Sequence, residues 1–216
     1  MKLVDRDYMV LRELDRWRFL LGRQIWLLCG FSSKRTCDRR LKTLKEAGYI
    51  EQEYKLYGVP RFNTVSRSGK SLIGASLKPD KVRLEQIYHD IAVVDTAIYF
   101  HLKEGVPLGS ISSEKSLHRL DGFDTPRRHQ PDFVFKQEQK IHAIEVELNA
   151  KAKNRMMKIL SDNYTAYETQ KWVVPNDGSK IRRILKEKES SYPNIEVLSL
   201  EEITEYVKHV GGGSGG

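Results

Sequence analysis

The sequence predicts a mixed α/β protein of the α+β kind, in which a small helical module with one hairpin precedes a larger mixed sheet flanked by helices. Three helix-like segments and an alternating hairpin fill the chain before residue 80, and a helix, three strands, a helix and a strand follow. Charge divides the chain at the same place. Residues 1–80 hold 17 Lys and Arg against 9 Asp and Glu, whereas residues 81–216 hold 20 basic and 20 acidic residues. The net charge of +8 therefore belongs to the first module.

Length and composition set the broad class. The 216 residues suffice for one or two domains with their own cores. Cys29 and Cys37 are too few for a secreted disulfide framework and are interpreted as reduced thiols. No apolar run has the length of a membrane span, and the N-terminus lacks the apolar stretch of a signal peptide, so we expect a cytoplasmic bacterial protein with no membrane partner. Residues 211–216, GGGSGG, are interpreted as an expression linker.

The first module is predicted to contain helices over residues 5–20, 23–28 and 34–47. Ser32 or Ser33 can cap the third helix, and Gly48 ends it. Cys37, Leu41 and Leu44 form a narrow apolar stripe along it, with basic residues on its other faces. The alternating segment 49–66, with Gly58 and Pro60 at its turn, predicts a hairpin, and residues 66–75 begin another helix.

Three helices followed by a hairpin, over residues 5–78, resemble a winged helix-turn-helix, a DNA-binding module of bacterial regulators. The passage LKEAGYIEQ after the third helix adds to this resemblance. It implies that the third helix enters the major groove of double-stranded DNA and that the hairpin, the wing, touches the backbone or the minor groove. The candidate DNA-binding residues are Ser33, Lys34, Arg35, Arg39 and Lys42 on the helix, and Lys55 and Arg61 on the wing. A merely well-solvated basic surface is the alternative.

The second module, residues 81–210, follows a linker at 78–80. A long helix over 81–104 ends at Gly105 and Pro107. Residues 106–120 are interpreted as a strand and 121–128 as a loop. Two antiparallel strands within 130–148 are joined by about four polar residues. A helix over 150–168, a strand over 171–175, a helix over 178–189, a strand over 194–200 and a helix over 200–210 complete the mixed sheet.

Carboxylates interrupt the apolar strands of this module. Because side chains alternate along a strand, Glu145 and Glu147 share one face, about 7 Å apart, opposite Ile144 and Val146. A short hairpin would place Asp132 beside them. Several carboxylates on a covered face repel one another unless a cation such as Mg²⁺ or Mn²⁺ neutralises them. Such a cation can activate water and polarise a phosphodiester.

Lys151 follows Glu147 by four residues and could swing back over the site to orient water or stabilise charge on a phosphate. The alternative for this segment is a solvent-facing pair of glutamates that forms ion pairs with Lys151 and Lys153. Tyr164 and Tyr167 are interpreted as packing residues of the helix rather than as nucleophiles.

The PD dipeptide followed by EVE and a lysine, on a helix–three strands–helix–strand framework, resembles the PD-(D/E)XK nucleases of the restriction-endonuclease-like fold, over about residues 81–175. The resemblance implies that Asp132 and Glu145 bind metal. The position that should carry lysine is Glu147 here, and Lys151 is the candidate to replace it. Further acidic ligands could be Glu85, Asp90 or Glu114.

Nearly the whole chain resembles the replication-relaxation family of bacterial plasmids and mobile elements, through YHDIAVVDTAIYF, SEKSLHR, HQPDF and AIEVELNAKAKNR. In that pattern His129 belongs with the PD motif.

Two functions follow from these resemblances. One is a DNA-binding protein that nicks or cleaves DNA with Mg²⁺ or Mn²⁺ during plasmid replication or mobilisation. The other is a non-catalytic regulator or adaptor that retains a nuclease-like fold. Contacts with other plasmid-processing proteins and a homodimer are left open.

Overall fold

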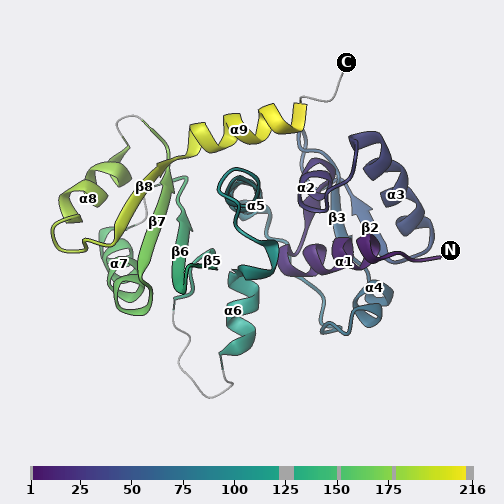
Figure 1. Ribbon diagram of the computed structural model, residues 1–216, viewed down its shortest axis with the longest axis horizontal. Helices are drawn as coiled ribbons and strands as arrows, with labels where there is room; N and C mark the ends of the chain where they lie inside the picture. Colours follow the sequence, from purple (N-terminus) through teal and green to yellow (C-terminus); the bar gives the residue numbers. More distant parts are fainter. Residues whose placement is uncertain (1, 122–128, 150–151, 177–178, 213–216) are drawn as a thin grey trace. The chain divides into compact units, whose positions relative to one another are not determined.

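The computed structural model describes residues 2–121, 129–149, 152–176 and 179–212, and within them a mixed α/β protein with two sheets (Figure 1). The chain divides into two compact units. Unit 1 holds the described residues up to Val94 and from Lys208 onward, and unit 2 holds Asp95–Val207. The predicted mixture of helices and sheets is thereby confirmed. The predicted domain bounds, 1–78 and 81–210, remain a prediction.

Unit 1 packs its helices around a small antiparallel sheet of order β1-β3-β2. Its elements are α1 (Asp5–Trp17), β1 (Leu20–Leu21), α2 (Gly22–Leu28), α3 (Lys34–Glu46), β2 (Ile50–Glu53), β3 (Phe62–Val65) and α4 (Arg67–Leu72). Phe19 and Phe62 stack with ring centroids 4.5 Å apart and belong to a buried cluster with Leu21, Val59 and Ile87. This cluster joins the strands to the start of α5 (Ile87–Leu102), a helix with residues in both units.

Local signals account for α3. Ser33 caps it by accepting a hydrogen bond from Thr36 N at 3.2 Å, and the chain turns after it at Gly48, whose φ is +76°. Cys37, Leu41 and Leu44 are its buried residues. The predicted cap, stripe and end of this helix are confirmed.

The first helix is shorter than predicted. It ends at Trp17 because Arg18 adopts a φ of +68°, and Leu20 and Leu21 form a strand that pairs with Asn63 and Phe62. The pairing with β3 supplies backbone hydrogen bonds that the helical pattern of the sequence does not reveal. The predicted helix over residues 5–20 was therefore wrong in its last turn.

Unit 2 is built on a five-stranded sheet of order β4-β5-β6-β7-β8. The first three strands are antiparallel, whereas β6, β7 and β8 are parallel. The elements after α5 are β4 (Ile111–Ser113), α6 (Glu114–Leu120), β5 (Phe133–Gln137), β6 (Lys140–Val146), α7 (Lys153–Ala166), β7 (Thr169–Val174), α8 (Lys180–Lys188), β8 (Ile195–Ser199) and α9 (Leu200–Gly212). The predicted mixed sheet with a helical crossover is confirmed.

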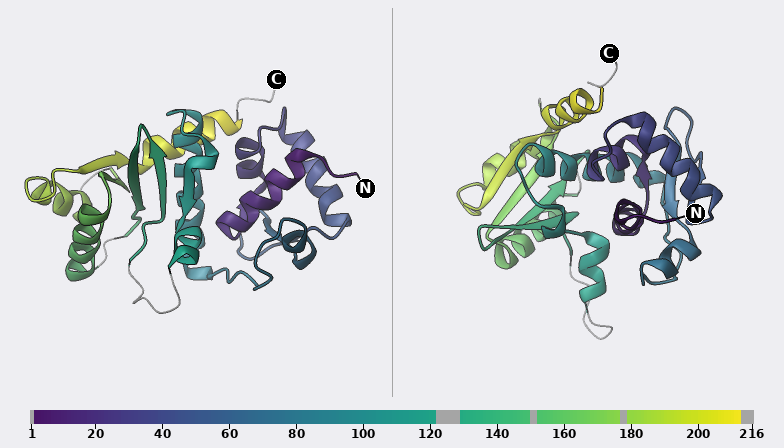
Figure 2. Two further views of the ribbon diagram at one scale, coloured as in Figure 1. Left: turned by 60° about the horizontal axis from the view of Figure 1, so that its bottom comes forward. Right: turned by 45° about the vertical axis from the view of Figure 1, so that its right-hand side comes forward.

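Helices cover both faces of this sheet (Figures 1 and 2). On one face, α7 and α8 bury Trp172 and Val174 of β7 in a cluster with Leu160 and Leu185. On the other face, Phe100 of α5 packs against the rings of Phe133 and Phe135, at centroid distances of 6.2 Å and 5.0 Å. The alternating side chains of β5, β6 and β7 thus fill two separate cores.

Three predicted segments of the second module, residues 81–210, differ from the structure. Only Ile111–Ser113 of residues 106–120 is a strand, because Ser113 caps α6 by accepting a hydrogen bond from Ser116 N. The long helix begins at Ile87 rather than at residue 81, after a 3₁₀ turn over Leu84–Gln86. The β5–β6 turn has two residues rather than four, Glu138 and Gln139, both with positive φ as a tight hairpin requires.

Candidate functional site

The hairpin register places Asp132 across from Glu145. Phe133 pairs with Ile144 and Val134 with Ala143, so the residue before β5 continues the ladder opposite Glu145. Asp132 Oδ2 accepts a hydrogen bond from Val146 N at 2.7 Å, and the Asp132 carbonyl accepts one from Glu114 N at 2.8 Å. The half-buried Asp132 is thereby held at the meeting point of β4, β5 and β6.

Glu145 is a buried carboxylate, with 2% of its surface exposed. Its Oε1 lies 2.6 Å from His129 Nε2 and accepts a hydrogen bond from Asn163 Nδ2 at 2.9 Å. Burial raises the pKa of Glu145 above its usual range. The hydrogen bonds from His129 and Asn163 act in the opposite direction, and the nearby Asp132 adds to the increase. The structure therefore brings three predicted residues, His129, Asp132 and Glu145, into one cluster.

Two other predicted catalytic residues follow the end of β6. Glu147 is 6% exposed, and its backbone N–H donates to Val173 O at 2.9 Å, so the chain stays beside β7 for one residue past the strand. A solvent-facing position for Glu145 and Glu147 is wrong, because both are buried. Lys151 lies outside the described residues, and its part in the site remains a prediction.

Asn163 is a site residue that sequence reasoning missed. It is 1% exposed on α7, in the same buried stripe as Met156, Ile159 and Leu160. A single amide in an otherwise apolar stripe indicates a buried polar partner, because an amide without a hydrogen bond is costly in a core. That signal is present in the sequence, although it does not say which residue the amide meets.

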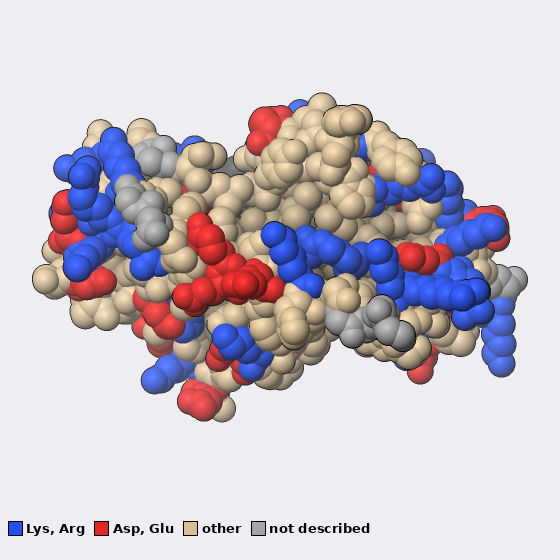
Figure 3. Space-filling model, turned by 90° about the horizontal axis from the view of Figure 1, so that it is seen from above, with Lys and Arg blue, Asp and Glu red and all other residues tan. Residues whose placement is uncertain are grey.

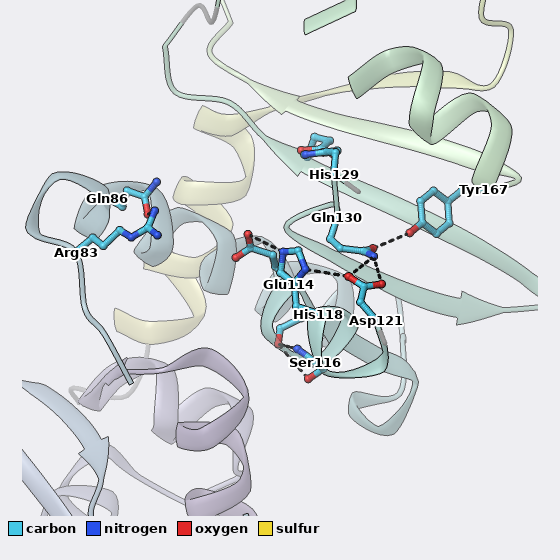
Figure 4. A network of polar contacts seen from close by, with 11 residues as sticks. Arg83, Gln86, Glu114, Ser116, His118, Asp121, His129, Gln130 and Tyr167 are labelled. Carbon is cyan, nitrogen blue, oxygen red and sulfur yellow. Dashed lines mark hydrogen bonds and ion pairs between the residues drawn. The ribbon is translucent and has the colours of Figure 1, made fainter. Parts of the chain in front are cut away.

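A second line of polar residues runs beside this cluster (Figure 4). His118 on α6 lies between two carboxylates, with Nδ1 3.0 Å from Asp121 Oδ2 and Nε2 3.7 Å from Glu114 Oε1. Gln130 Nε2 donates to both carboxylate oxygens of Asp121, at 3.0 Å and 3.2 Å, and its Oε1 lies 3.5 Å from the hydroxyl of Tyr167. Glu114, one of the predicted accessory acids, thus joins a network built from α6 and the segment before β5.

The hydroxyl of Tyr167 extends this network by donating to Gln130. Burial raises the pKa of its hydroxyl, and the negative charges of Glu145 and Asp121 raise it further. The hydrogen bond to Gln130 gives Tyr167 a polar role beyond the packing that the sequence suggested. Tyr164 stacks edge-on against Tyr192 at 5.4 Å, as a packing residue does.

The remaining accessory acids lie in unit 1. Glu85 is exposed in the 3₁₀ turn before α5, and Asp90 is half-buried with its carboxylate 3.5 Å from His89 Nδ1. Their role as metal ligands remains a prediction.

The donor set of the cluster around Asp132 and Glu145 is small. Across residues 2–121, 129–149, 152–176 and 179–212, no group of three or more His, Cys, Asp or Glu side chains has the arrangement to hold a metal ion. Mg²⁺, however, is commonly bound through one or two carboxylates and several waters. Asp132, which directly precedes β5, and Glu145, opposite it on β6, match that smaller requirement in their donor chemistry.

Unit 1 carries the predicted DNA-binding residues on α3 and on the β2–β3 loop, residues 54–61. Exposed cations in this set are Lys34, Arg35, Arg39, Lys42, Lys55 and Arg61. Ser33 differs from them because its hydroxyl caps α3. Figure 3 shows Lys and Arg side chains gathered over unit 1, at the right of that view.

A groove of about 630 Å³ runs between α3 and the hairpin. Five cations line it, against two acids, Asp38 and Glu46. The cations are Arg23, Lys34, Lys42, Lys45 and Arg61. Arg40, also on α3, faces elsewhere, because its guanidinium is bound to the fully buried Asp7 of α1. Some basic residues of α3 therefore line the groove, whereas Arg40 forms a structural ion pair.

None of the helices within the described ranges is long and apolar enough to cross a membrane. Comparisons with protein families, with curated proteins and with solved structures find no match to this chain.

Proposed function

We propose that this chain is a DNA-binding protein of a bacterial plasmid or mobile element that hydrolyses or nicks DNA with Mg²⁺ or Mn²⁺. The observation that carries the proposal is the pairing of Asp132 with the buried Glu145 across two strands of a mixed sheet. The three antiparallel strands β4, β5 and β6, followed by the crossover helix α7 and the parallel strand β7, support the resemblance to the PD-(D/E)XK nucleases, with the short helix α6 inserted between β4 and β5. The arrangement of α1 to β3 supports the resemblance to a winged helix-turn-helix.

The groove beside α3 supports the binding part of the proposal. Its cations can neutralise phosphates, and the exposed Arg35 and Arg39 can reach base edges or backbone from the outer face of the helix. Unit 1 would select the site on double-stranded DNA, and unit 2 would act on the backbone.

In the catalytic part, Asp132 and Glu145 would hold the cation. When bound, the cation would lower the pKa of a coordinated water and polarise the phosphodiester. Val146 N fixes one oxygen of Asp132, while His129 and Asn163 fix one oxygen of Glu145, so both carboxylates keep a set orientation. His129, whose side chain is 23% exposed, connects the buried Glu145 to solvent. Lys151 is proposed to take the place of the lysine that Glu147 displaces.

DNA binding is tested by single substitutions that each remove one arginine. Arg35→Ala and Arg39→Ala should each weaken binding of duplex DNA and reduce the slope of log affinity against log salt by about 1. Arg12→Ala removes the same charge from an exposed position on α1 and serves as the control. Equal salt slopes for all three variants and the wild type would contradict the proposal.

Catalysis is tested by nicking of supercoiled plasmid in Mn²⁺. Asp132→Asn should abolish nicking while keeping an oxygen that can accept from Val146 N. Asp162→Asn, on α7 in a solvent-accessible ion pair with Lys158, should leave nicking unchanged. Nicking that is absent in the wild type, or insensitive to Asp132→Asn, counts against a nuclease.

A non-catalytic adaptor is the second candidate function. The observation that favours it is that Glu145 and Asp132 already have protein partners in His129, Asn163 and Val146 N. Calorimetric titration with Mn²⁺ separates the two. Binding that Glu145→Gln removes supports the nuclease, whereas no binding, or binding that Glu145→Gln leaves unchanged, supports the adaptor.

A further inference from the structure

The β2–β3 loop exposes two tyrosines that take no part in the core. Tyr57 is 101% exposed and Tyr54 is 69% exposed. Aromatic side chains usually bury a large apolar area, so two exposed rings on one short loop require an explanation.

The loop that carries them is anchored. Val59 is buried in the cluster of Phe19, Leu21, Phe62 and Ile87, and Leu56 packs against the same cluster. Val59 N donates to Leu56 O at 3.3 Å, which closes a turn in which Gly58 has a φ of +77°. The backbone is therefore held from the inside, and the tyrosines project outward from a fixed support.

A positively charged side chain lies close to one of the two rings. The guanidinium of Arg61 lies 4.7 Å from the centroid of Tyr54, a cation–π contact. Arg61 also lines the groove beside α3, together with Lys34 and Lys42. The basic groove thus leads directly to an aromatic side chain.

A basic groove with exposed aromatic rings on the adjoining loop is an arrangement by which proteins hold unpaired nucleic acid, since the cations follow the phosphates and the rings stack on bases. In an intact duplex each base is already stacked between its neighbours and offers no free face. We infer that the β2–β3 loop is a base-stacking site, at which Tyr57 and Tyr54 receive unpaired bases of locally melted or single-stranded DNA. Anchoring of the loop reduces the entropy lost when a base stacks on it.

This inference rests on the proposed DNA binding by unit 1, and the test separates the two. Fluorescence anisotropy would compare the full chain on a paired duplex and on the same duplex with a central run of mismatches. We expect roughly tenfold tighter binding to the mismatched DNA, which corresponds to about 1.4 kcal/mol. Tyr57→Ala should remove most of this preference, whereas Tyr57→Phe, which keeps the ring, should retain it.

The control is Tyr88→Ala, because Tyr88 is a tyrosine on α5 with 62% exposure. It should change neither affinity. Equal affinity of the wild type for both DNAs overturns the inference and leaves DNA binding intact. The same holds if Tyr57→Ala lowers the affinity for the paired and the mismatched DNA by the same factor. Absence of binding to either DNA overturns both the inference and the proposed function.

Discussion

Replacement of the buried Glu145 by Gln should stabilise the fold progressively as pH rises. Glu145 has a pKa above its usual range because burial disfavours the carboxylate. The unfolded chain releases this proton at about pH 4.3, whereas the folded chain retains it to higher pH. Wild-type stability is therefore fully present below the unfolded pKa and is lost as pH rises towards the folded pKa. Glutamine does not ionise, so the variant escapes this loss.

The magnitude follows from linkage. One proton held by the folded state alone changes the free energy of unfolding by about 1.4 kcal/mol per pH unit. The advantage of Glu145→Gln over the wild type should grow with at most that slope and then level off above the folded pKa. The hydrogen bonds from His129 and Asn163 favour the carboxylate and reduce the gain, while burial, the largest effect, sets its sign. The glutamine oxygen can still accept from Asn163.

The assay is urea unfolding, followed by circular dichroism at a series of pH values, for the wild type, Glu145→Gln and Glu196→Gln. Glu196 lies on β8, has a side chain 49% exposed and forms an ion pair with Lys171, so it is the matched exposed control. Its substitution should shift stability by less than about 1 kcal/mol, as is usual for surface ion pairs. A Glu145→Gln difference that is constant across the pH series, or that favours the wild type as pH rises, would refute the reasoning.

Three further predictions concern stability and reactivity. Leu160→Ala should destabilise unit 2 by about 2–5 kcal/mol, because Leu160 is 0% exposed beneath the sheet; a smaller loss in urea unfolding would mean that the site collapses around the cavity. Asp7→Ala should cost unit 1 about 1–3 kcal/mol, since it removes the acceptor of hydrogen bonds from the partly exposed Arg40 and from Val4 N; an unchanged unfolding midpoint would show that the pair adds no net stability. Cys37 should resist a thiol reagent at pH 8 until the protein is unfolded, because burial raises the pKa of its thiol to about 12; rapid labelling of the native protein would contradict this.

Elements with local signals could be predicted from the sequence. The third helix carries its own cap at Ser33, its own apolar stripe and a glycine after its end, and the structure reproduces all three. The strand β1 has no such signal. Leu20 continues a helical pattern, and it forms a strand with Leu21 because β3 lies beside them and offers hydrogen-bond partners. The strand predicted over residues 106–120 is wrong in length, because the strand has only three residues and a helix begins directly after it.

The candidate site shows the same division. Strand alternation grouped Glu145 with Glu147, a short hairpin predicted Asp132 beside them, and the antiparallel register places Asp132 opposite Glu145. Alternation could not reveal that Asn163, eighteen residues further along the chain, donates to Glu145, because that contact depends on how α7 crosses the sheet. The network of His118, Asp121 and Gln130 likewise depends on α6, a helix that lies within the segment where the sequence predicts a strand.

The sequence by itself determined the division of charge, the order of most helices and strands, and the side of each strand on which its carboxylates lie. These properties depend on neighbouring residues, through helical and strand periodicity and through capping. Only the tertiary structure decided that Glu145 is buried, which partners hold it, and that Arg40 stabilises α1 while Arg35 and Arg39 remain exposed. Burial and hydrogen bonding between distant segments arise when elements pack. The periodicity of a single strand or helix does not predict which other element will pack against it.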